Sequence, residues 1–517
     1  MPWGNVLYSN FGDGIDRRFL PNNPTYPKGS LWDLKNMIYD RSSEDAEKMG
    51  GVIQLGENTI GGTCTGLYDY DEGTMQVACS SDGGIYQRST GNWAAATGGG
   101  AGTFNTASTT RWSGTMFYGA TTAKRLLVLA NDVSGNAPQR YDNSNGVAAL
   151  GGSPPAAGKF PISANSRVWM AAGDNLFASA TNDAEEWVKK DSFNIQVDRG
   201  SGDITGLFDA GGRILVFKRN RIYQIPYDTE RNTQVLKAHG SIGCVAHHTI
   251  AQIQVRGRSA VAFLSDSGLM AVIPTDTTGD WNVQHISEKV KKILDGRSFA
   301  NQDKAWATFN NERLEYWCQY PTSTAIPSVG LVANMARERG AIRWTRHDRS
   351  KLTAGTMAVS AGQDIQIAGT STGKIYQMHQ GHNWDGAGYT GTWFTAAFNQ
   401  GRMDYMKQYG RWFIDAATRG DYNVFVNASV GRKNLPMPTL KNEQGITDFG
   451  NVKGWGQGGW GVALWGGGGI SGVHYRFGGV ARGHYARLRI STTGSDQWFA
   501  VYGLHLESAL ASNTIAA

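Results

Sequence analysis

The 517-residue chain contains few cysteines, few prolines and few charged residues. Fourteen prolines and the lack of a Gly-x-y period exclude a collagen-like protein. Charged residues make up 18% and the net charge is only +6, with basic residues in short, separate runs, so charge alone does not indicate nucleic-acid binding. The cysteines form no Cys-x-x-Cys pair and have no histidine at ligand spacing, which favours free buried thiols at Cys64, Cys79, Cys244 and Cys318.

Long apolar runs and catalytic motifs are also missing. No stretch approaches the roughly 18 apolar residues that a membrane-spanning helix needs, and the start of the chain has no signal-peptide pattern. We therefore expect a protein made in a cytoplasm, without stable membrane insertion. Nucleophile-elbow, zinc-protease and dinucleotide motifs do not occur, so we expect no enzyme activity, no cofactor and no metal site.

Glycine and aromatic residues are abundant instead. The 68 glycines amount to about 13% of the chain, roughly twice the usual share. Aromatic residues make up 11%, which supplies enough apolar bulk for a core and excludes wholesale disorder. These proportions predict a folded protein rich in strands and turns, with glycines such as Gly83, Gly84 and Gly373 closing hairpins.

A strand-turn-strand unit recurs along the chain. Three copies, within 81–87, 219–225 and 371–378, share the sequence Ile-Tyr-Gln after a polar or glycine turn. Two weaker copies lie within 173–177 and 266–271, and another apolar run precedes each copy. Repeated hairpins at intervals of roughly 40 to 50 residues are typical of a β-propeller, because each blade covers its neighbour's apolar face. We predict an all-β protein with a β-propeller-like domain over 62–386; a large β-sandwich is the alternative.

Two further segments stand out near this repeated region. Residues 286–294 place Ile286, Val290 and Leu294 on one face at helical spacing, which predicts one short helix docked on the sheet. His247 and His248 follow an apolar run and are expected in a strand, where their rings would point to opposite faces and could not form a metal pair.

The two ends of the chain differ from the repeats. Residues 1–61 contain turn formers without a long periodic run, which predicts an extended N-terminal arm that joins the core. Residues 387–517 carry longer strand-like runs, which predict an antiparallel β-sandwich-like domain. A glycine- and tryptophan-rich loop at 450–469 interrupts this domain. Indoles are favoured at interfaces, so we expect a subunit or partner interface here, where Trp460→Ala would weaken assembly without unfolding the monomer; the candidate residues are Trp455, Trp460 and Trp465.

Three stretches resemble the tail nozzle proteins of short-tailed bacteriophages, also called tail tubular protein B or head-completion tail factor. The first, 14–40, begins Gly-Ile-Asp-Arg-Arg and leads into the Asn-hydrophobic run Asn36-Met37-Ile38. The second and most specific, 187–268, includes Phe-Lys-Arg-Asn-Arg-Ile-Tyr and Phe-Leu-Ser-Asp-Ser-Gly. The third, 483–507, resembles the family's terminal strand pair. The sequence departs from the family at residues 48–51, where Lys-Met-Gly-Gly replaces the usual Lys-Arg-Pro-Gly turn.

This resemblance implies a structural subunit of the virion tail. Members contain a propeller and form a homohexameric ring below the portal and adaptor, through which DNA is ejected and on which tail spikes or fibres dock. Such a protein would be made in the host bacterial cytoplasm and would touch phage DNA only transiently. The resemblance supplies no catalytic residues. Two alternatives stay open: a sialidase- or lyase-like propeller enzyme acting on glycans, and a propeller scaffold that binds proteins.

Overall fold

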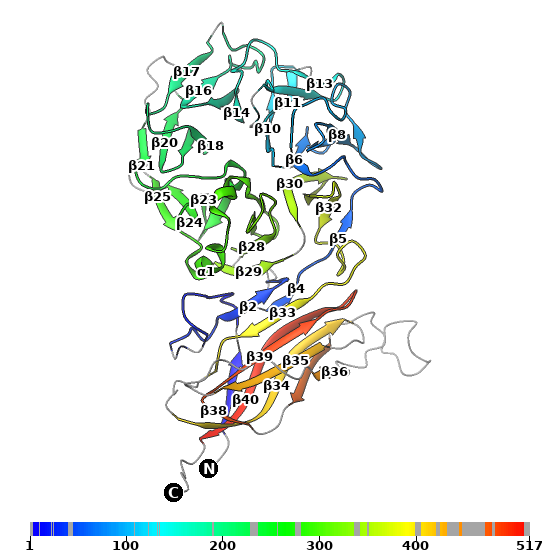
Figure 1. Ribbon diagram of the computed structural model, residues 1–517, viewed down its shortest axis with the longest axis vertical. Coiled ribbons are helices and arrows are strands. Elements are labelled where there is room, and N and C mark those ends of the chain that lie inside the picture. The colour runs from blue at the N-terminus through cyan, green and yellow to red at the C-terminus, as the bar shows by residue number, and fades with distance from the viewer. Residues whose placement is uncertain are drawn as a thin grey trace.

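The computed structural model of the chain contains many small antiparallel sheets and very little helix (Figure 1). The residues that it describes are 4–9, 11–21, 23, 25–39, 45–107, 109–121, 124–131, 133, 135–188, 191–227, 236–255, 257–274, 281–335, 342–348, 351–398, 405–419, 424–431, 444–446, 471–477 and 481–510. The predicted all-β architecture is confirmed.

Within these residues, six separate four-stranded sheets and the first four strands of a nine-stranded sheet make up seven propeller blades. Blades 1 to 3 consist of β6 (Cys64–Tyr70), β7 (Met75–Ser80), β8 (Ile85–Arg88), β9 (Ala94–Ala95); β10 (Trp112–Tyr118), β11 (Arg125–Asn131), β12 (Gln139–Asp142), β13 (Gly146–Ala149); and β14 (Lys159–Ala164), β15 (Arg167–Ala172), β16 (Asn175–Ala178), β17 (Phe193–Gln196).

Blades 4 to 7 follow in chain order, except for the last strand of blade 7. They consist of β18 (Ile204–Asp209), β19 (Arg213–Lys218), β20 (Arg221–Pro226), β21 (Leu236–His239); β22 (Ala251–Val255), β23 (Arg258–Ser265), β24 (Gly268–Pro274), β25 (Trp281–His285); β26 (Trp306–Asn310), β27 (Glu315–Tyr320), β28 (Val329–Asn334), β29 (Arg343–His347); and β30 (Leu352–Ser360), β31 (Gln363–Thr370), β32 (Ile375–Met378), β5 (Val52–Gln54).

The first strand of each blade lies at the centre of the ring (Figure 1). Inner strands of neighbouring blades contact one another in two series: β6 through β10 and β14 to β18, and β22 through β26 and β30 back to β6. The 3-10 helix η2 (His247–Thr249) contacts both β18 and β26 and so connects the two series. The ring closes in blade 7, where β5 from the N-terminal arm pairs antiparallel with β32. Strands that are distant in sequence therefore hold the ring shut.

Apolar clusters fill the spaces between successive blades. The cluster between blades 2 and 3 contains Leu126 and Val128, and the cluster between blades 1 and 2 contains Leu127 and Leu129. Neighbouring residues of one strand thus face two different blades. This burial on both faces explains why the strands are continuous apolar runs rather than alternating ones.

The Ile-Tyr-Gln repeat occupies equivalent positions in blades 1, 4 and 7. All five predicted hairpins are the second and third strands of their blades. In each full copy the isoleucine is completely buried, at positions 85, 222 and 375. The tyrosine hydroxyl donates to an aspartate in each copy; the pairs are Tyr86 with Asp82, Tyr223 with Asp198, and Tyr376 with Asp385.

The glutamine of this repeat joins blades to one another. Gln87 of blade 1 accepts a hydrogen bond of 2.9 Å from the Tyr141 hydroxyl of blade 2. Gln224 of blade 4 accepts one of 2.9 Å from the Trp281 indole of blade 5. In blades 1 and 4 the sequence repeat therefore combines a core residue, a tyrosine-carboxylate bond and an inter-blade hydrogen bond.

A second pair of sheets lies beside the ring and below it in Figure 1. One sheet has the strand order β3 (Met37–Tyr39), β4 (Ala46–Lys48), β40 (Trp498–Leu510), β34 (Lys407–Arg419), β37 (Ser471–Phe477). In addition, β1 (Gly4–Ser9) pairs with β40, and β38 (Ala481–Gly483) pairs with β34. The other continues blade 6 from β29 through β2 (Leu31–Lys35), β33 (Gly391–Thr395), β39 (Tyr485–Thr492), β35 (Val424–Gly431) and β36 (Gln444–Ile446).

The two sheets share one apolar core, which confirms the sandwich-like arrangement. This core includes Trp393, Leu488 and Leu504 from the lower sheets and continues into blades 5 and 6 through Leu264 and Tyr316. The N-terminal arm contributes β1 to β5 and so enters both lower sheets and blade 7. Ring and lower sheets are joined by paired strands as well as by side-chain packing.

The predicted helix is present as a short turn pair, η3 (Glu288–Val290) and α1 (Lys291–Leu294). Val290 and Leu294 are fully buried in the shared core, as the helical spacing predicted. On the other side, Lys289 and Lys292 donate to main-chain carbonyls of the arm at Asp13 and Arg18, at 3.1 and 3.3 Å. The four cysteines are buried and free.

Candidate functional site

The centre of the ring is lined by inner strands that begin with an irregularity. In β6, β18 and β30 the register with the second strand shifts by one residue, and the extra residue is Thr65, Thr205 or Thr353. Such bulges re-aim side chains and are common near functional sites. At 2.6 Å each, the Thr205 hydroxyl donates to the Cys244 carbonyl in the connection to blade 5, and the Thr353 hydroxyl donates to the Cys64 carbonyl of blade 1.

Glycines next to these positions let side chains approach the channel closely. Glycine is the third residue of β6, β10 and β18 and the fourth residue of β30. A Cβ atom on Gly355 would lie 2.4 Å from the Trp306 ring, and one on Gly206 would lie 2.5 Å from Ile250. Small residues here leave space for bulky ones from neighbouring blades, which narrows the centre of the ring.

Arg111, just before β10, crosses the channel. Its Nη1 donates to the Thr353 carbonyl of blade 7 at 2.9 Å, and its Nη2 donates to the Lys304 carbonyl at 3.0 Å. Lys304 ends the 3-10 helix η4 (Phe299–Lys304), which leads into blade 6. One guanidinium next to blade 2 is thus bonded both to blade 7 and to the connection that leads into blade 6.

Arg111, together with Ser113 and the two histidines, separates the channel into two chambers. The charged chamber, of about 260 Å³, lies at the start of the inner strands and is lined by Lys159, Asp203, Asp303, Lys304 and Asn131. The hydroxyl chamber, of about 280 Å³, lies further along the inner strands. Its polar lining includes Thr65, Thr115, Thr353 and Thr356, and its apolar lining includes Leu67, Ile162, Leu207, Phe208 and Trp306.

His247 and His248 lie in η2 rather than in the expected strand, so the prediction of rings on opposite faces is wrong. Their ring centroids are 5.3 Å apart, and both line the two chambers. The helical turn arises because Thr249 and Ile250 donate main-chain bonds back to Ala246 and His247. The described residues contain no group of three or more His, Cys, Asp or Glu side chains placed to hold a metal ion.

Both imidazoles are uncharged at neutral pH. Burial lowers the pKa of His247 to about 3, and Nδ1 of this residue accepts the Leu207 amide at 3.4 Å. Burial also lowers the pKa of His248, and His247, Arg111 and Lys304 add to this effect. Each ring is partly open to the channel, but protein surrounds the rest of it, so loss of hydration of the charged form outweighs that exposure.

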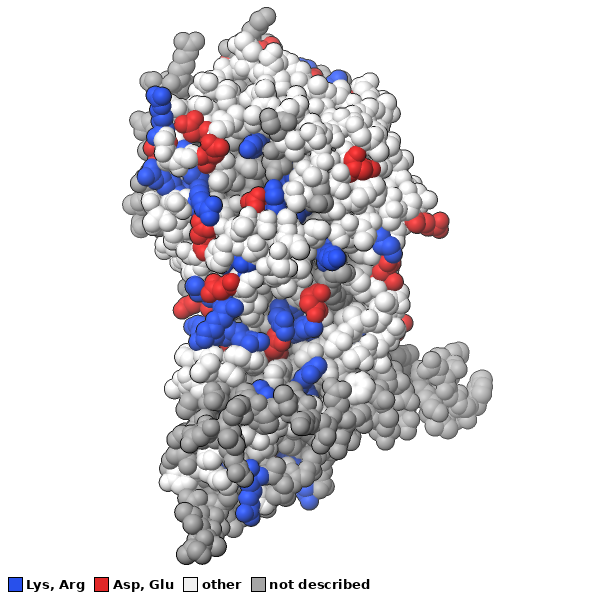
Figure 2. Space-filling view, in the orientation of Figure 1, with Lys and Arg blue, Asp and Glu red and all other residues white. Residues whose placement is uncertain are grey.

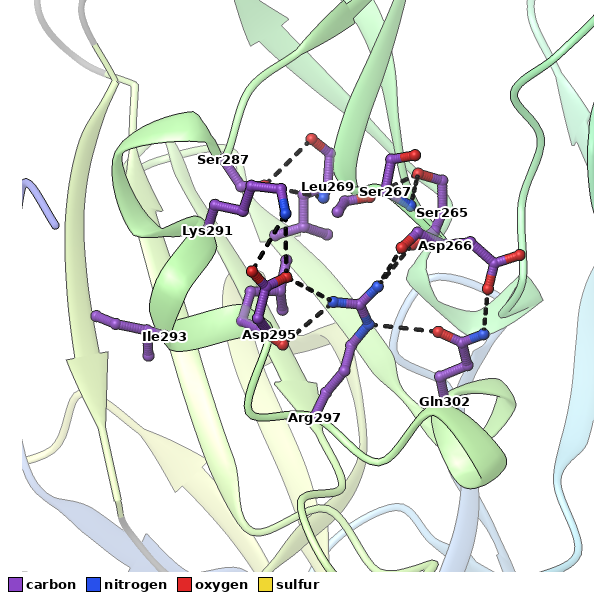
Figure 3. A network of polar contacts seen from close by, with 12 residues as sticks. Ser265, Asp266, Ser267, Leu269, Ser287, Lys291, Ile293, Asp295, Arg297 and Gln302 are labelled. Carbon is purple, nitrogen blue, oxygen red and sulfur yellow. Dashed lines mark hydrogen bonds and ion pairs between the residues drawn. The ribbon is translucent and has the colours of Figure 1, made fainter. Parts of the chain in front are cut away.

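A polar network joins the turn between β23 and β24 of blade 5 to the segment that leads into blade 6 (Figure 3). The buried Arg297 guanidinium donates to the Asp266 carbonyl at 2.6 Å and to Gln302 at 3.3 Å. Gln302 donates to the Asp266 carboxylate at 2.5 Å, and Arg219 of blade 4 binds the same carboxylate at 2.9 Å. The exposed Phe299 ring lies 4.3 Å from the Arg297 guanidinium. These contacts fix the relative positions of three successive blades.

Charged side chains are interspersed on the face seen in Figure 2, and many gather at the waist between ring and lower sheets. Ion pairs here join the arm to blade 6: Asp33 binds both Arg17 and Arg346, and Lys35 binds Asp348. Lys291 pairs with Asp295 on the short helix at 3.1 Å. Carboxylates thus engage four cations of this region, Arg17, Lys35, Lys291 and Arg346, whereas Lys289 and Lys292 donate to main-chain carbonyls.

Trp455, Trp460 and Trp465, the residues predicted to form an interface, lie outside the described residues. Apart from His247 and His248, the residues that line the channel were not among the sequence predictions. A signal for them exists in the short pattern of a small or hydroxyl residue followed by glycine, at 65–66, 113–114, 205–206 and 354–355. No helix within the described part of the chain is long and apolar enough to cross a membrane.

No protein-family model matches the chain, and no curated protein matches it by sequence. Three solved structures are similar to part of the chain. The β-propeller domain of Cps50 (Swd1) from Myceliophteria thermophila is 14% identical, with a TM-score of 0.40, over 63% of this chain and 98% of that one. U3-55K is 10% identical, with a TM-score of 0.41, and the match covers 63% of this chain and 98% of that one. YCF48 from Cyanidioschyzon merolae is 10% identical, with a TM-score of 0.39, and the match covers 64% of this chain and 99% of that one.

Proposed function

We propose that this protein is a rigid scaffold that binds other proteins within a larger assembly. The observation that carries the proposal is the continuous join between ring and lower sheets. Blade 6 extends through β2 into the lower sheets, and one apolar core runs through both parts. Domains linked by small polar interfaces move relative to each other, whereas a large apolar interface holds them fixed. Such a body can present several binding surfaces at constant distance and angle.

The finer form of this proposal is the role that the sequence resemblance implies: a subunit of a hexameric tail nozzle, with the adaptor above and spikes or fibres docked on it. In that role the DNA path would run between subunits. The propeller channel is unsuited to it, because Arg111 spans a space whose chambers hold only about 260 and 280 Å³. The paired cations at the waist also suit a surface past which DNA slides without tight phosphate binding.

Mass photometry of the purified full chain tests both forms, alone and with the proteins encoded next to it. The nozzle role predicts a particle of six copies, alone or after the adaptor protein is added. A scaffold of another kind predicts a stable complex of different stoichiometry with a neighbouring gene product. A strict monomer that binds none of these proteins and cleaves bacterial surface glycans would overturn the proposal in favour of the enzyme alternative.

A further inference from the structure

We propose that the charged chamber binds a small zwitterion, a free α-amino acid with a compact apolar side chain. The carboxylate of the ligand would lie at the inner end of the chamber, near Lys159 and the two channel histidines, and its ammonium group at the outer end, near Asp203. The chamber lies inside the ring, whereas a scaffold would bind its partners on outer surfaces. The inference therefore goes beyond the proposed function and does not rest on it.

Two charged side chains of the lining are available to a ligand. Lys159 and Asp203 both line the chamber, and within the described residues neither side chain forms a hydrogen bond or an ion pair. The other two opposite charges, Lys304 and Asp303, pair with each other at 3.0 Å. Lys159 is half-buried and Asp203 is exposed, so the available cation lies further from solvent than the available anion. A ligand with a negative inner end and a positive outer end would satisfy both.

The two histidines supply neutral hydrogen-bonding groups at the inner end. Nδ1 of His247 accepts the Leu207 amide at 3.4 Å, so the neutral ring carries its proton on Nε2. His248 forms no side-chain hydrogen bond within the described part of the chain. Nε2 of His247 and both ring nitrogens of His248 keep accessible surface, and both residues line the chamber. Each ring can therefore donate one hydrogen bond to an anion in the channel.

Fixed charges around His248 favour the negative end of the ligand at this position. Burial lowers the pKa of His248 most, and the charges of Arg111 and Lys304 lower it further, which means that they create a positive potential at the ring. Both terminal nitrogens of Arg111 bond main-chain carbonyls, so Arg111 contributes this potential and no hydrogen bond to the ligand. Lys159 has no such carbonyl partners and can bind the carboxylate directly.

A bulge at the start of β14 positions Lys159. The register between β14 and β15 shifts between Lys159 and Ile162, and Phe160 within this bulge has φ of +56°. Bulky side chains rarely adopt this conformation. It is held here because the Phe160 amide donates to Ser113 at 3.2 Å and the Phe160 ring packs with its centroid 4.4 Å from that of His247. Backbone strain of this kind persists where the surroundings fix it and is concentrated at ligand sites.

Size and apolar lining select the side chain of the ligand. A cavity of about 150 Å³ lined by apolar side chains is large enough to bind benzene. The charged chamber holds about 260 Å³, which accommodates a branched aliphatic side chain together with an amino group and a carboxylate. Phe160, Ile204 and Val245 provide its apolar walls. Because both charges must lie on one small molecule, a free amino acid fits the chamber better than either end of a peptide.

Isothermal titration calorimetry of the full chain with L-leucine tests the proposal. Leucinamide has nearly the same shape without the carboxylate charge, and 4-methylpentanoate lacks only the ammonium group. We expect leucine to bind at least about tenfold more tightly than either probe, because each probe loses one charge-assisted contact. A probe that binds as tightly as leucine, or no binding of millimolar leucine, would overturn the proposal.

Three variants locate the site. Lys159→Gln and Asp203→Asn change side chains that form no hydrogen bond or ion pair within the described residues, so both variants should keep the urea midpoint of the wild-type protein. Each should weaken leucine binding by about tenfold. Lys28→Gln, at an exposed position of the N-terminal arm, is the matched control and should leave binding unchanged. Wild-type affinity for leucine in Lys159→Gln or in Asp203→Asn would place the ligand elsewhere and contradict the proposal.

Discussion

Closure of the ring can be tested at Gly373, in the turn between β31 and β32 of blade 7. This residue has φ of +77°, and a Cβ atom added there would lie 2.1 Å from the carbonyl oxygen of Ile60. The Gly373 carbonyl in turn accepts the Ile60 amide at 3.0 Å. Ile60 belongs to the segment that connects β5 with blade 1. Gly373→Ala therefore perturbs the point where the two ends of the propeller meet.

The magnitude follows from comparison with Gly362, in the other turn of the same blade. Gly362 has nearly the same φ, +75°, but a Cβ atom there would meet nothing within 4 Å. In either variant the alanine must adopt a left-handed backbone conformation, which destabilises the folded state by roughly 1–2 kcal/mol. The lower conformational entropy of the unfolded chain partly offsets this cost. Only Gly373→Ala adds overlap with backbone, which costs about 1–3 kcal/mol. We expect Gly373→Ala to be less stable than Gly362→Ala by that amount.

Urea unfolding followed by tryptophan fluorescence measures this difference. With a slope of about 3 kcal/mol per molar urea, the Gly373→Ala midpoint should lie roughly 0.3–1 M below that of Gly362→Ala. Hydrogen exchange should speed up in β5 and at Ile60 in the first variant only. Equal midpoints for the two variants would refute the reasoning, because they would show that the contact between blade 7 and the β5 connection does not constrain the ring.

Two other predictions use single side chains. Gln224→Leu should destabilise the protein by about 1–3 kcal/mol, because the Trp281 indole loses its inter-blade acceptor. The control is Gln377→Leu, at the equivalent position of blade 7, where the glutamine side chain forms no hydrogen bond within the described residues; this variant should change stability by less than about 0.5 kcal/mol. Equal urea midpoints for the two variants would contradict the role assigned to Gln224. Stability should fall as the pH drops from about 6.5 towards 3, because His247 takes up a proton in the unfolded chain but not in the folded protein, where its pKa is lowered to about 3. The urea midpoint of His247→Gln should therefore depend less on pH over this window than that of the wild-type protein. An unchanged pH dependence would show that other groups cause it.

Local features made much of the propeller predictable. Each hairpin is encoded by a turn of a few residues between two apolar runs, so the repeats in blades 1, 3, 4, 5 and 7 could be read directly. Blades 2 and 6 were missed because their second and third strands are separated by longer connections, 132–138 and 321–328, without that turn. The short helix was predictable for the same reason, since its apolar spacing is contained within nine residues.

The candidate site could not be read in the same way. Arg111 acquires its role from carbonyls about 190 and 240 residues away in the chain, at Lys304 and Thr353. His247 and His248 were misassigned because the main-chain bonds of one short turn, and not the apolar run before it, set the direction of their rings. Thr65 looks like any other strand threonine until the bulge of β6 and the neighbouring blades enclose it.

The sequence by itself determined the strand class, the hairpin unit and the apolar runs that fill the spaces between blades, because these depend on contacts between residues close together in the chain. The tertiary structure alone decided that β5 closes the ring, that β2 joins blade 6 to the lower sheets, and that one arginine divides the channel into two chambers. Each of these features pairs segments hundreds of residues apart, and which distant partners meet depends on the packing of the whole ring rather than on local pattern.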